Sequence, residues 1–268
     1  MMATEVPRFT GSIPDLYERY LGPLLFEPYA RDLAARVRVA AGGRLLELAC
    51  GTGQLTRHLA AALPSGATID ATDLNEAMTL VGRTRVPSPS VAWGTADATA
   101  LLFDDATFDG ACCQFGVMFF PDKVAAARQA RRVLKPGGTY WLNAWSTLAD
   151  NPLARIANET AARLLGGETP PFLRIPYGYG DRDRIAADLR AGGFPTIDVE
   201  TVDVEAVAGS AADVAIGFVQ GTPMVNEIRE RGVVTPEAVT EAVAAAIAQQ
   251  FSAGPVRAPM RAHVIRAT

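Results

Sequence analysis

The sequence has few of the residues that bind metals or form disulfides, with three cysteines and two histidines among 268 residues. Cys50 stands alone, and Cys112 and Cys113 are adjacent, so there is no CxxC pair or Cys/His cluster with metal-site spacing. Neighbouring residues of a strand point to opposite faces, which suits small buried hydrophobic cysteines. This pattern predicts a reduced, cytoplasmic protein without disulfides and without a bound metal.

Long apolar runs and clusters of one charge are also missing. No apolar segment approaches the roughly 20 residues of a membrane span, and the first residues lack the charged-then-apolar pattern of a signal peptide. The formal net charge is −4, and no basic stripe of the kind that binds a phosphate backbone is present. We therefore expect neither a membrane span nor a nucleic-acid partner.

The sequence does contain short apolar stretches that alternate with helical patterns. Strands are predicted at residues 44–49, 68–72, 108–113 and 139–145, with a weaker one at 91–95. Helical patterns lie between them, at residues 54–63, 75–83 and 122–134. Repeated strand–helix–strand units with short connections indicate parallel strands with helices on both faces. The predicted fold class is a doubly wound, Rossmann-like α/β sheet, which binds ligands at the carboxyl ends of its strands.

Three regions follow from this pattern. Residues 1–40 are expected to form a helical lid, since residues 8–40 read as helices rich in aromatic side chains. Residues 41–146 form the core, and residues 147–268 complete the sheet and carry helical cap insertions at about 147–180 and 209–254. The predicted elements of the last region are helices at 153–165, 182–191, 211–230 and 236–251, strands at 196–204 and 260–265, and a loop at 166–180.

The segment LLELACGTGQLT joins a strand to a helix through a glycine-rich turn. Gly51 and Gly53 permit positive φ and a close approach of the backbone to a ligand, and the helix that follows presents free amides. A pyrophosphate would also suit this turn, so a nicotinamide dinucleotide is the immediate alternative. Against it, Thr56 occupies the third glycine position of the dinucleotide fingerprint, and Glu47 places a carboxylate in the strand. Asp73, at the end of the next strand, suits a ribose in both interpretations.

Five ordered motifs between residues 44 and 145 resemble those of class I S-adenosylmethionine-dependent methyltransferases. They are Glu47-Leu-Ala-Cys-Gly-Thr-Gly53, Ala71-Thr-Asp-Leu-Asn-Glu-Ala-Met78, Gly94-Thr-Ala-Asp-Ala98, Phe108-Asp-Gly-Ala-Cys-Cys-Gln-Phe115 and Arg131-Arg-Val-Leu-Lys-Pro-Gly-Gly138. Within the class, the chain resembles the branch of the ubiquinone/menaquinone C-methyltransferases and bacterial small-molecule methyltransferases. Ala49 stands where that family often has glycine. The resemblance implies that residues 41–146 bind S-adenosylmethionine and that S-adenosylhomocysteine is the product.

The resemblance also implies roles for individual residues. The methionine part of the cofactor would meet Glu47, Ala49, Gly51, Gly53 and Gln114. Asp73 would bind the ribose hydroxyls, and the adenine would meet Leu74, Met78, Asp97 and Ala98. Tyr17 and Tyr20 are three residues apart on a predicted helix and so share a face, which would make them a lid over the cofactor. Residues expected at the acceptor pocket are Tyr17, Phe115, Trp145, Tyr177 and Tyr179.

The predicted function is transfer of a methyl group to a small-molecule acceptor. The flanking segments are rich in Ala, Val, Leu and Phe, which favours an apolar or aromatic acceptor and C- or O-methylation. The same composition would serve a homodimer interface. No residue stands out as a general base, and none is assigned. Two alternatives stay open at this point: an S-adenosylmethionine-binding protein that transfers no methyl group, and a nicotinamide-dependent oxidoreductase.

Overall fold

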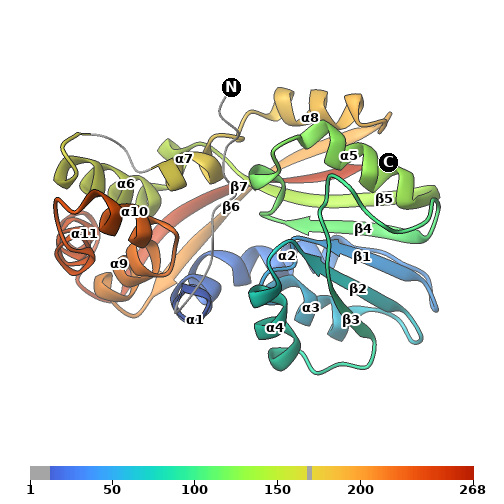
Figure 1. Cartoon of the computed structure of the whole chain (residues 1–268), viewed down its shortest axis with the longest axis horizontal. Coiled ribbons are helices and arrows are strands. Elements are labelled where there is room, and N and C mark those ends of the chain that lie inside the picture. The colour runs from blue at the N-terminus through green and yellow to red at the C-terminus, as the bar shows by residue number, and fades with distance from the viewer. Residues whose placement is uncertain (1–12, 168–170) are drawn as a thin grey trace.

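The computed structural model describes residues 13–167 and 171–268. At its centre is a seven-stranded sheet of order β3-β2-β1-β4-β5-β7-β6 (Figure 1). The strands are β1 (Arg44–Leu48), β2 (Thr68–Asp73), β3 (Val91–Thr95), β4 (Phe108–Gln114), β5 (Leu134–Trp145), β6 (Ile197–Ala208) and β7 (Val256–Ala267). Strands β1 to β5 are parallel, and β7 is antiparallel to both β5 and β6. The predicted doubly wound α/β fold is confirmed.

The order of the strands reverses at β1, which pairs with β2 on one side and with β4 on the other. Leu45 of β1 lies opposite Ile69 of β2 and Gly110 of β4. In an open α/β sheet, such a reversal leaves a crevice at the carboxyl ends of the two strands. The loops after β1, β2 and β4 therefore converge on one place.

Helices cover both faces of the sheet (Figure 1). Those of the core are α2 (Glu27–Arg36), α3 (Gln54–Ala62), α4 (Glu76–Arg85), α5 (Lys123–Val133) and α8 (Arg182–Ala191). Leu33, Leu55 and Leu59 of α2 and α3 pack on one face, and α5 and α8 bury their apolar sides on the other. Asn75 caps α4 by accepting a hydrogen bond from the Ala77 amide at 3.0 Å.

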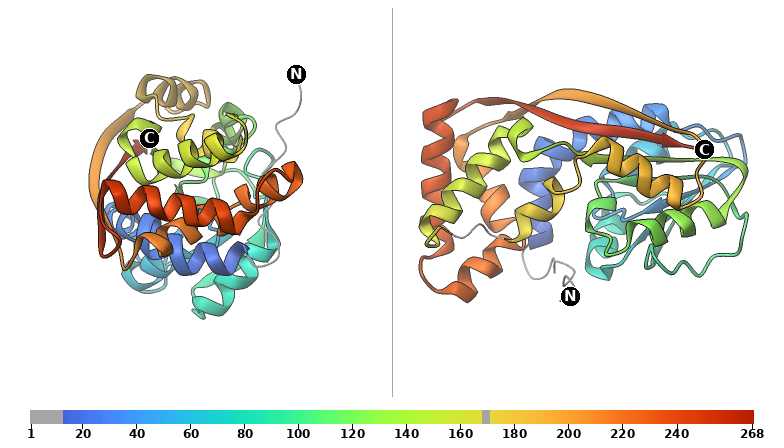
Figure 2. Two further views of the ribbon diagram at one scale, coloured as in Figure 1. Left: turned by 90° about the vertical axis from the view of Figure 1, so that its left-hand side faces the viewer. Right: turned by 90° about the horizontal axis from the view of Figure 1, so that it is seen from above.

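The long hairpin of β6 and β7 extends beyond the core and carries a helical cap (Figure 2). Its two strands pair without interruption from Ile197 opposite Ala267 to Ala208 opposite Val256. The cap helices are α6 (Pro152–Leu164), α7 (Pro171–Tyr177), α9 (Ala211–Gln220), α10 (Met224–Arg231) and α11 (Pro236–Gln250). The remaining short turns are η2 (Val117–Phe119) and η3 (Leu148–Asp150).

The N-terminal part of the described chain is helical, but one stretch is not an α-helix. Between α1 (Ile13–Leu16) and α2, the hydrogen bonds of η1 (Tyr17–Phe26) follow the π-helical pattern. The Tyr29 hydroxyl on α2 lies 3.1 Å from the carbonyl oxygens of Val202 and Met260, so this region is tied to the β6–β7 hairpin. Residues 1–12 of the expected lid lie outside the described part of the chain.

Several predicted boundaries in the C-terminal region need correction. The helix expected at 211–230 is two helices, since Gly221 ends α9 and Pro223, which lacks an amide proton, precedes α10. The loop expected at 166–180 contains α7, and the strands expected at 196–204 and 260–265 extend to the full length of β6 and β7. None of the helices within the described ranges is both long and apolar enough to cross a membrane.

Candidate functional site

The glycine-rich turn after β1 is built from left-handed backbone. Ala49, Gly51 and Gly53 have φ angles of 53°, 55° and 84°. A Cβ atom at Gly53 would lie 2.9 Å from Cη2 of Trp93, so this glycine is needed for packing as well as for its φ. A Cβ atom at Gly51 would meet only Cε of Met78, at 3.7 Å. The side of the turn at Gly51 is therefore open.

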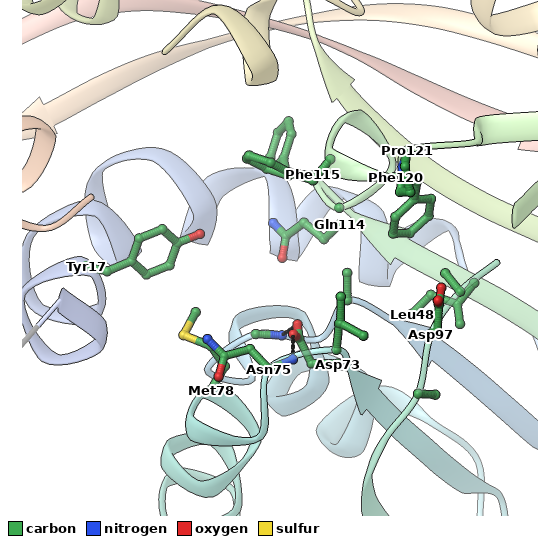
Figure 3. A pocket seen from close by; sticks show the side chains of 17 residues that line it. Tyr17, Leu48, Asp73, Asn75, Met78, Asp97, Gln114, Phe115, Phe120 and Pro121 are labelled. Carbon is green, nitrogen blue, oxygen red and sulfur yellow. Dashed lines mark hydrogen bonds between the residues drawn. The ribbon is translucent and has the colours of Figure 1, made fainter. Parts of the chain in front are cut away.

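A cavity lies at this open side, where the loops after β1, β2, β3 and β4 meet (Figure 3). We call it the first cavity. Ten of the residues predicted for the site line it: Tyr17, Ala49, Gly51, Asp73, Leu74, Met78, Asp97, Ala98, Gln114 and Phe115. Its lining also includes residues that the sequence did not single out, namely Leu48, Asn75, Ala96, Gly116, Phe119, Phe120 and Pro121.

Asp73 connects two of the converging loops. One carboxylate oxygen accepts the Gly51 amide at 2.9 Å, and the other accepts the Asn75 amide at 2.8 Å. Burial raises the pKa of Asp73, and these amide hydrogen bonds oppose that rise by favouring the charged form. The side chain thus holds the glycine-rich turn against the end of β2 and still borders the first cavity.

Asp97 and Gln114 approach the cavity from two other strands. Asp97 follows β3, and its carboxylate accepts both the amide and the hydroxyl of Thr99, at 2.8 and 2.7 Å. Gln114 ends β4, and its Nε2 donates to the carbonyl oxygen of Phe26 at 2.8 Å. The Gln114 side chain therefore supports η1 as well as lining the first cavity.

Glu47 lies behind the turn rather than in the lining of the cavity. It is 1% exposed, and its carboxyl group accepts a hydrogen bond from the Thr56 hydroxyl at 2.7 Å. Burial raises the pKa of Glu47 to about 8. Glu47 therefore joins β1 to α3 through the Thr56 hydroxyl, and its contact with the cofactor stays a prediction.

Replacing Glu47 with glutamine is expected to change how stability depends on pH. The folded state keeps the Glu47 proton up to about pH 8, whereas the unfolded chain loses it near the ordinary value of 4.5. Ionisation therefore costs the folded wild-type chain free energy as the pH rises between these two values. From pH 6 to pH 8, we expect wild type to lose about 2 kcal/mol more unfolding free energy than Glu47→Gln. Urea denaturation of both proteins at each pH measures this difference, and parallel pH curves would contradict it.

A second cavity adjoins the first. Tyr17, Phe115 and Phe119 line both. The second cavity is bordered almost entirely by apolar and aromatic side chains, which come from η1, the β4–α5 connection, the end of β5 and the cap. Beyond the three shared residues, its lining consists of Leu21, Leu25, Phe26, Met118, Trp145, Phe172, Leu173, Pro176, Tyr177, Phe218 and Thr222.

Phe115 is one of the residues between the two cavities. Its φ of 51° is in the left-handed region, and its amide donates to Asn143 Oδ1 at 3.1 Å. Its ring stacks on Trp145 at 4.0 Å between ring centroids, with an angle of 8° between the planes. Trp145 and Tyr177, both predicted for an acceptor pocket, line the second cavity.

Two predicted tyrosines point elsewhere. Tyr20 packs toward α9, because a Cβ atom added to Gly217 of α9 would lie 3.1 Å from the Cβ atom of Tyr20. The reason is the π-helical geometry of η1, in which residues three apart no longer share a face as they do on an α-helix. The Tyr179 hydroxyl donates to Asp188 at 2.8 Å, and Lys123 and Arg184 lie over its ring. Neither tyrosine lines the first or the second cavity.

Comparison with known proteins identifies the fold and its chemistry. A family model described as a methyltransferase domain matches residues 45–138. The ubiquinone/menaquinone biosynthesis C-methyltransferase UbiE of Caulobacter vibrioides is 34% identical over 183 residues, which cover 62% of this chain and 73% of UbiE. The demethylmenaquinone methyltransferase of Clavibacter sepedonicus is 32% identical over 184 residues, covering 64% and 74%.

A solved structure supports the same assignment of fold. Phosphoethanolamine N-methyltransferase 2 of Haemonchus contortus, in complex with S-adenosyl-L-methionine, aligns with a TM-score of 0.60 at 17% identity. The alignment covers 95% of this chain and 56% of that one. At this level of identity, the likeness establishes the architecture.

Fold, sequence and site together define an S-adenosylmethionine-dependent methyltransferase, and the chain belongs to class I of these enzymes. Its nearer relatives in sequence include the ubiquinone/menaquinone C-methyltransferases. The first cavity fits the cofactor, since Gly51 leaves room beside Met78 and two carboxylates, Asp73 and Asp97, border the space. The enzyme uses S-adenosylmethionine to methylate a small molecule, so neither an oxidoreductase nor a binding protein without methyl transfer is favoured.

Proposed function

We propose that the first cavity holds S-adenosylmethionine and that the second holds an uncharged or weakly polar aromatic acceptor. The observation that carries this proposal is the contrast between two adjoining cavities. The described lining of the first includes Asp73 and Asp97 and no lysine or arginine, which suits a cationic ligand better than a pyrophosphate. The described lining of the second has no formally charged side chain.

The residues of the first cavity divide between the parts of the cofactor. We assign the methionine part to Ala49, Gly51 and Gln114, and the ribose hydroxyls to Asp73. The adenine is assigned to Leu74, Met78, Asp97 and Ala98. Their placement at the ends of successive strands supports these roles. Glu47 and Gly53 support the turn instead, through Thr56 and Trp93.

The chain's own contribution to the reaction is positioning and exclusion of water. When bound, S-adenosylmethionine supplies a methyl group on a positively charged sulfur. Phe115, Tyr17 and Phe119 border both cavities and are placed to hold an acceptor ring against that group in a dry environment. Burial raises the pKa values of Tyr17 and Tyr177 far above neutrality, so these hydroxyls stay protonated.

The acceptor should therefore need no enzyme base to accept the methyl group. An electron-rich ring carbon, or a phenol that is already ionised when it binds, meets this requirement. The two relatives in sequence named above are a ubiquinone/menaquinone biosynthesis C-methyltransferase and a demethylmenaquinone methyltransferase, which favours a quinone-like ring and C-methylation over O-methylation.

A panel of acceptors tests this function. Release of S-adenosylhomocysteine should be measured with apolar hydroquinones and phenols, and with charged amines and carboxylic acids of similar size. We expect turnover at least tenfold higher in kcat/KM with the aromatic, uncharged set. Trp145→Ala should lower kcat/KM for the aromatic acceptors while leaving the affinity for S-adenosylhomocysteine within threefold. Preference for the charged acceptors would contradict the proposal.

The regional division of the chain is part of the same proposal. Residues 1–40 would act as a lid, 41–146 as the S-adenosylmethionine-binding core, and 147–268 as the completion of the sheet with the cap. Lining of the second cavity by η1, α7 and α9 supports roles for lid and cap in acceptor binding. The expected homodimer and cytoplasmic location stay predictions.

A further inference from the structure

The π-helical segment η1 forms one side of the second cavity. Leu21, Leu25 and Phe26 line that cavity, and Tyr17 lines both cavities. The Tyr17 ring points into the first cavity (Figure 3) and stacks on Phe26 at 4.9 Å between centroids. π-Helical turns are rare and occur frequently at functional sites. The placement of η1 therefore decides the shape of the boundary between the two cavities.

Glu18, next to Tyr17, fastens η1 to the glycine-rich turn. Its side chain is buried, and one carboxylate oxygen accepts the Thr52 hydroxyl at 2.5 Å. The other accepts Gln54 Nε2 at 2.6 Å and pairs with the Arg85 guanidinium of α4 at 2.5 Å. Thr52 lies between Gly51 and Gly53. A buried carboxylate with donors on both oxygens, one of which is a guanidinium, is a strong attachment.

Gly22 makes this attachment possible. A Cβ atom at this position would lie 2.5 Å from Gln54 Nε2 and 3.3 Å from a Glu18 carboxylate oxygen. Gly22 does not have a positive φ. Glycine is therefore required here because a side chain has no room, and not because of the backbone conformation. A side chain here would displace the amide that Glu18 binds.

The far end of η1 is fastened to the first cavity as well. The Phe26 carbonyl accepts Gln114 Nε2 at 2.8 Å. The first attachment is to the glycine-rich turn, the start of α3 and the end of α4, and the second is to Gln114, which lines the first cavity. Leu21, Leu25 and Phe26 of η1 line the second cavity.

The second cavity is too small for an aromatic ring in this arrangement. Its volume is about 60 Å³. A protein cavity that binds benzene measures about 150 Å³. An aromatic acceptor therefore needs more space than this cavity alone offers, and η1, which polar contacts fasten near both of its ends, is one of the walls that set that space.

We infer that Glu18 is a positioning residue whose buried contacts with Thr52, Gln54 and Arg85 hold η1 against the glycine-rich turn and so keep Tyr17 at the boundary of the two cavities for methyl transfer. The inference rests on the proposed function for the identity of the acceptor. The attachment itself is a property of the chain that can be measured without any acceptor.

Amide hydrogen exchange of the full chain tests the attachment. In Glu18→Gln, which keeps hydrogen-bonding atoms but loses the charge, peptides covering Tyr17–Phe26 should exchange at least tenfold faster than in wild type. Glu18→Ala should increase the exchange rate of these peptides further. Gly22→Ala leaves every charge in place and should reproduce it by displacing Gln54. Glu200→Gln is the matched control, since Glu200 of β6 pairs with Arg36 of α2, and it should leave η1 exchange within threefold of wild type.

Steady-state kinetics test the positioning role. Glu18→Gln should lower kcat at least tenfold and leave the KM for S-adenosylmethionine within threefold, because the first cavity keeps its lining. A loss confined to the KM for S-adenosylmethionine would overturn the inference, as would unchanged exchange in η1 or equally faster exchange throughout the chain. If wild type methylates no aromatic acceptor, the proposed function fails, while hydrogen exchange still decides whether Glu18 holds η1.

Discussion

Replacing Asp73 with alanine is expected to weaken the binding of S-adenosylhomocysteine at least tenfold. The substitution removes the acceptor assigned to the ribose hydroxyls and also frees the amides of Gly51 and Asn75. Hydrogen bonds to charged groups contribute about 1.5–3 kcal/mol each, and 1.4 kcal/mol corresponds to a factor of ten. Loss of even one such bond from the complex therefore produces the expected change. Isothermal titration calorimetry of both proteins measures it.

Asp73→Asn separates the two roles of this side chain. The asparagine side chain keeps one oxygen that can accept from the backbone amide of Gly51 or of Asn75, but it turns an NH₂ donor toward the other amide. The unfolding free energy of Asp73→Asn should therefore lie between those of wild type and Asp73→Ala. Its affinity should also be intermediate. If Asp73→Ala binds S-adenosylhomocysteine as tightly as wild type does, this carboxylate does not bind the ribose.

Gly116→Ala is expected to destabilise the fold and to damage the first cavity at the same time. A Cβ atom at this position would lie 2.3 Å from Cβ of Ala49 and 2.9 Å from Sγ of Cys113. Neither neighbour is the end of a flexible side chain, so backbone must move. Overpacking of this kind costs about 1–3 kcal/mol. Urea denaturation should show a loss of unfolding free energy in that range. Calorimetry should show a loss of S-adenosylhomocysteine affinity of at least tenfold, since Gly116 and Ala49 line the first cavity.

Ala49→Gly provides the rescue for this variant. Ala49 has a φ of 53°, which glycine adopts without strain, so the single change should be nearly neutral. Combined with Gly116→Ala, it removes the closer of the two contacts and should recover more than half of the lost stability. Gly94→Ala is the control, since its Cβ would meet nothing within 4 Å. If the double variant is as unstable as Gly116→Ala, the contact with Ala49 is not the cause.

Most of the first cavity was predictable because it depends on local rules. Strand ends, the glycine-rich turn and the Asn75 cap are visible in the chain as apolar stretches followed by turn residues. Parallel strands bring their carboxyl ends to one edge of a sheet, so Asp73, Asp97 and Gln114 had to converge once the fold class was known.

The parts that escaped prediction depend on contacts between distant segments. The sequence did not show that the Glu47 carboxyl group accepts the hydroxyl of Thr56, nine positions later. Tyr20 looks equivalent to Tyr17 only if the segment is an α-helix, and its π-helical geometry arises in a stretch that contains Gly22 and Pro23. The attachment of Glu18 to Arg85 joins residues that no local pattern relates.

The β6–β7 hairpin separates the strands that place Asp73 from the inserted helices α9, α10 and α11. Its strands pair along their whole length before the chain enters α9, α10 and α11. Phe218 and Thr222, inside this insertion, line the second cavity and do not line the first. If the second cavity holds the acceptor, as proposed, substitutions in the insertion should alter acceptor selectivity without shifting the strand register that places Asp73. In engineering terms, the insertion is the part of this enzyme to diversify when a library of new acceptor specificities is wanted.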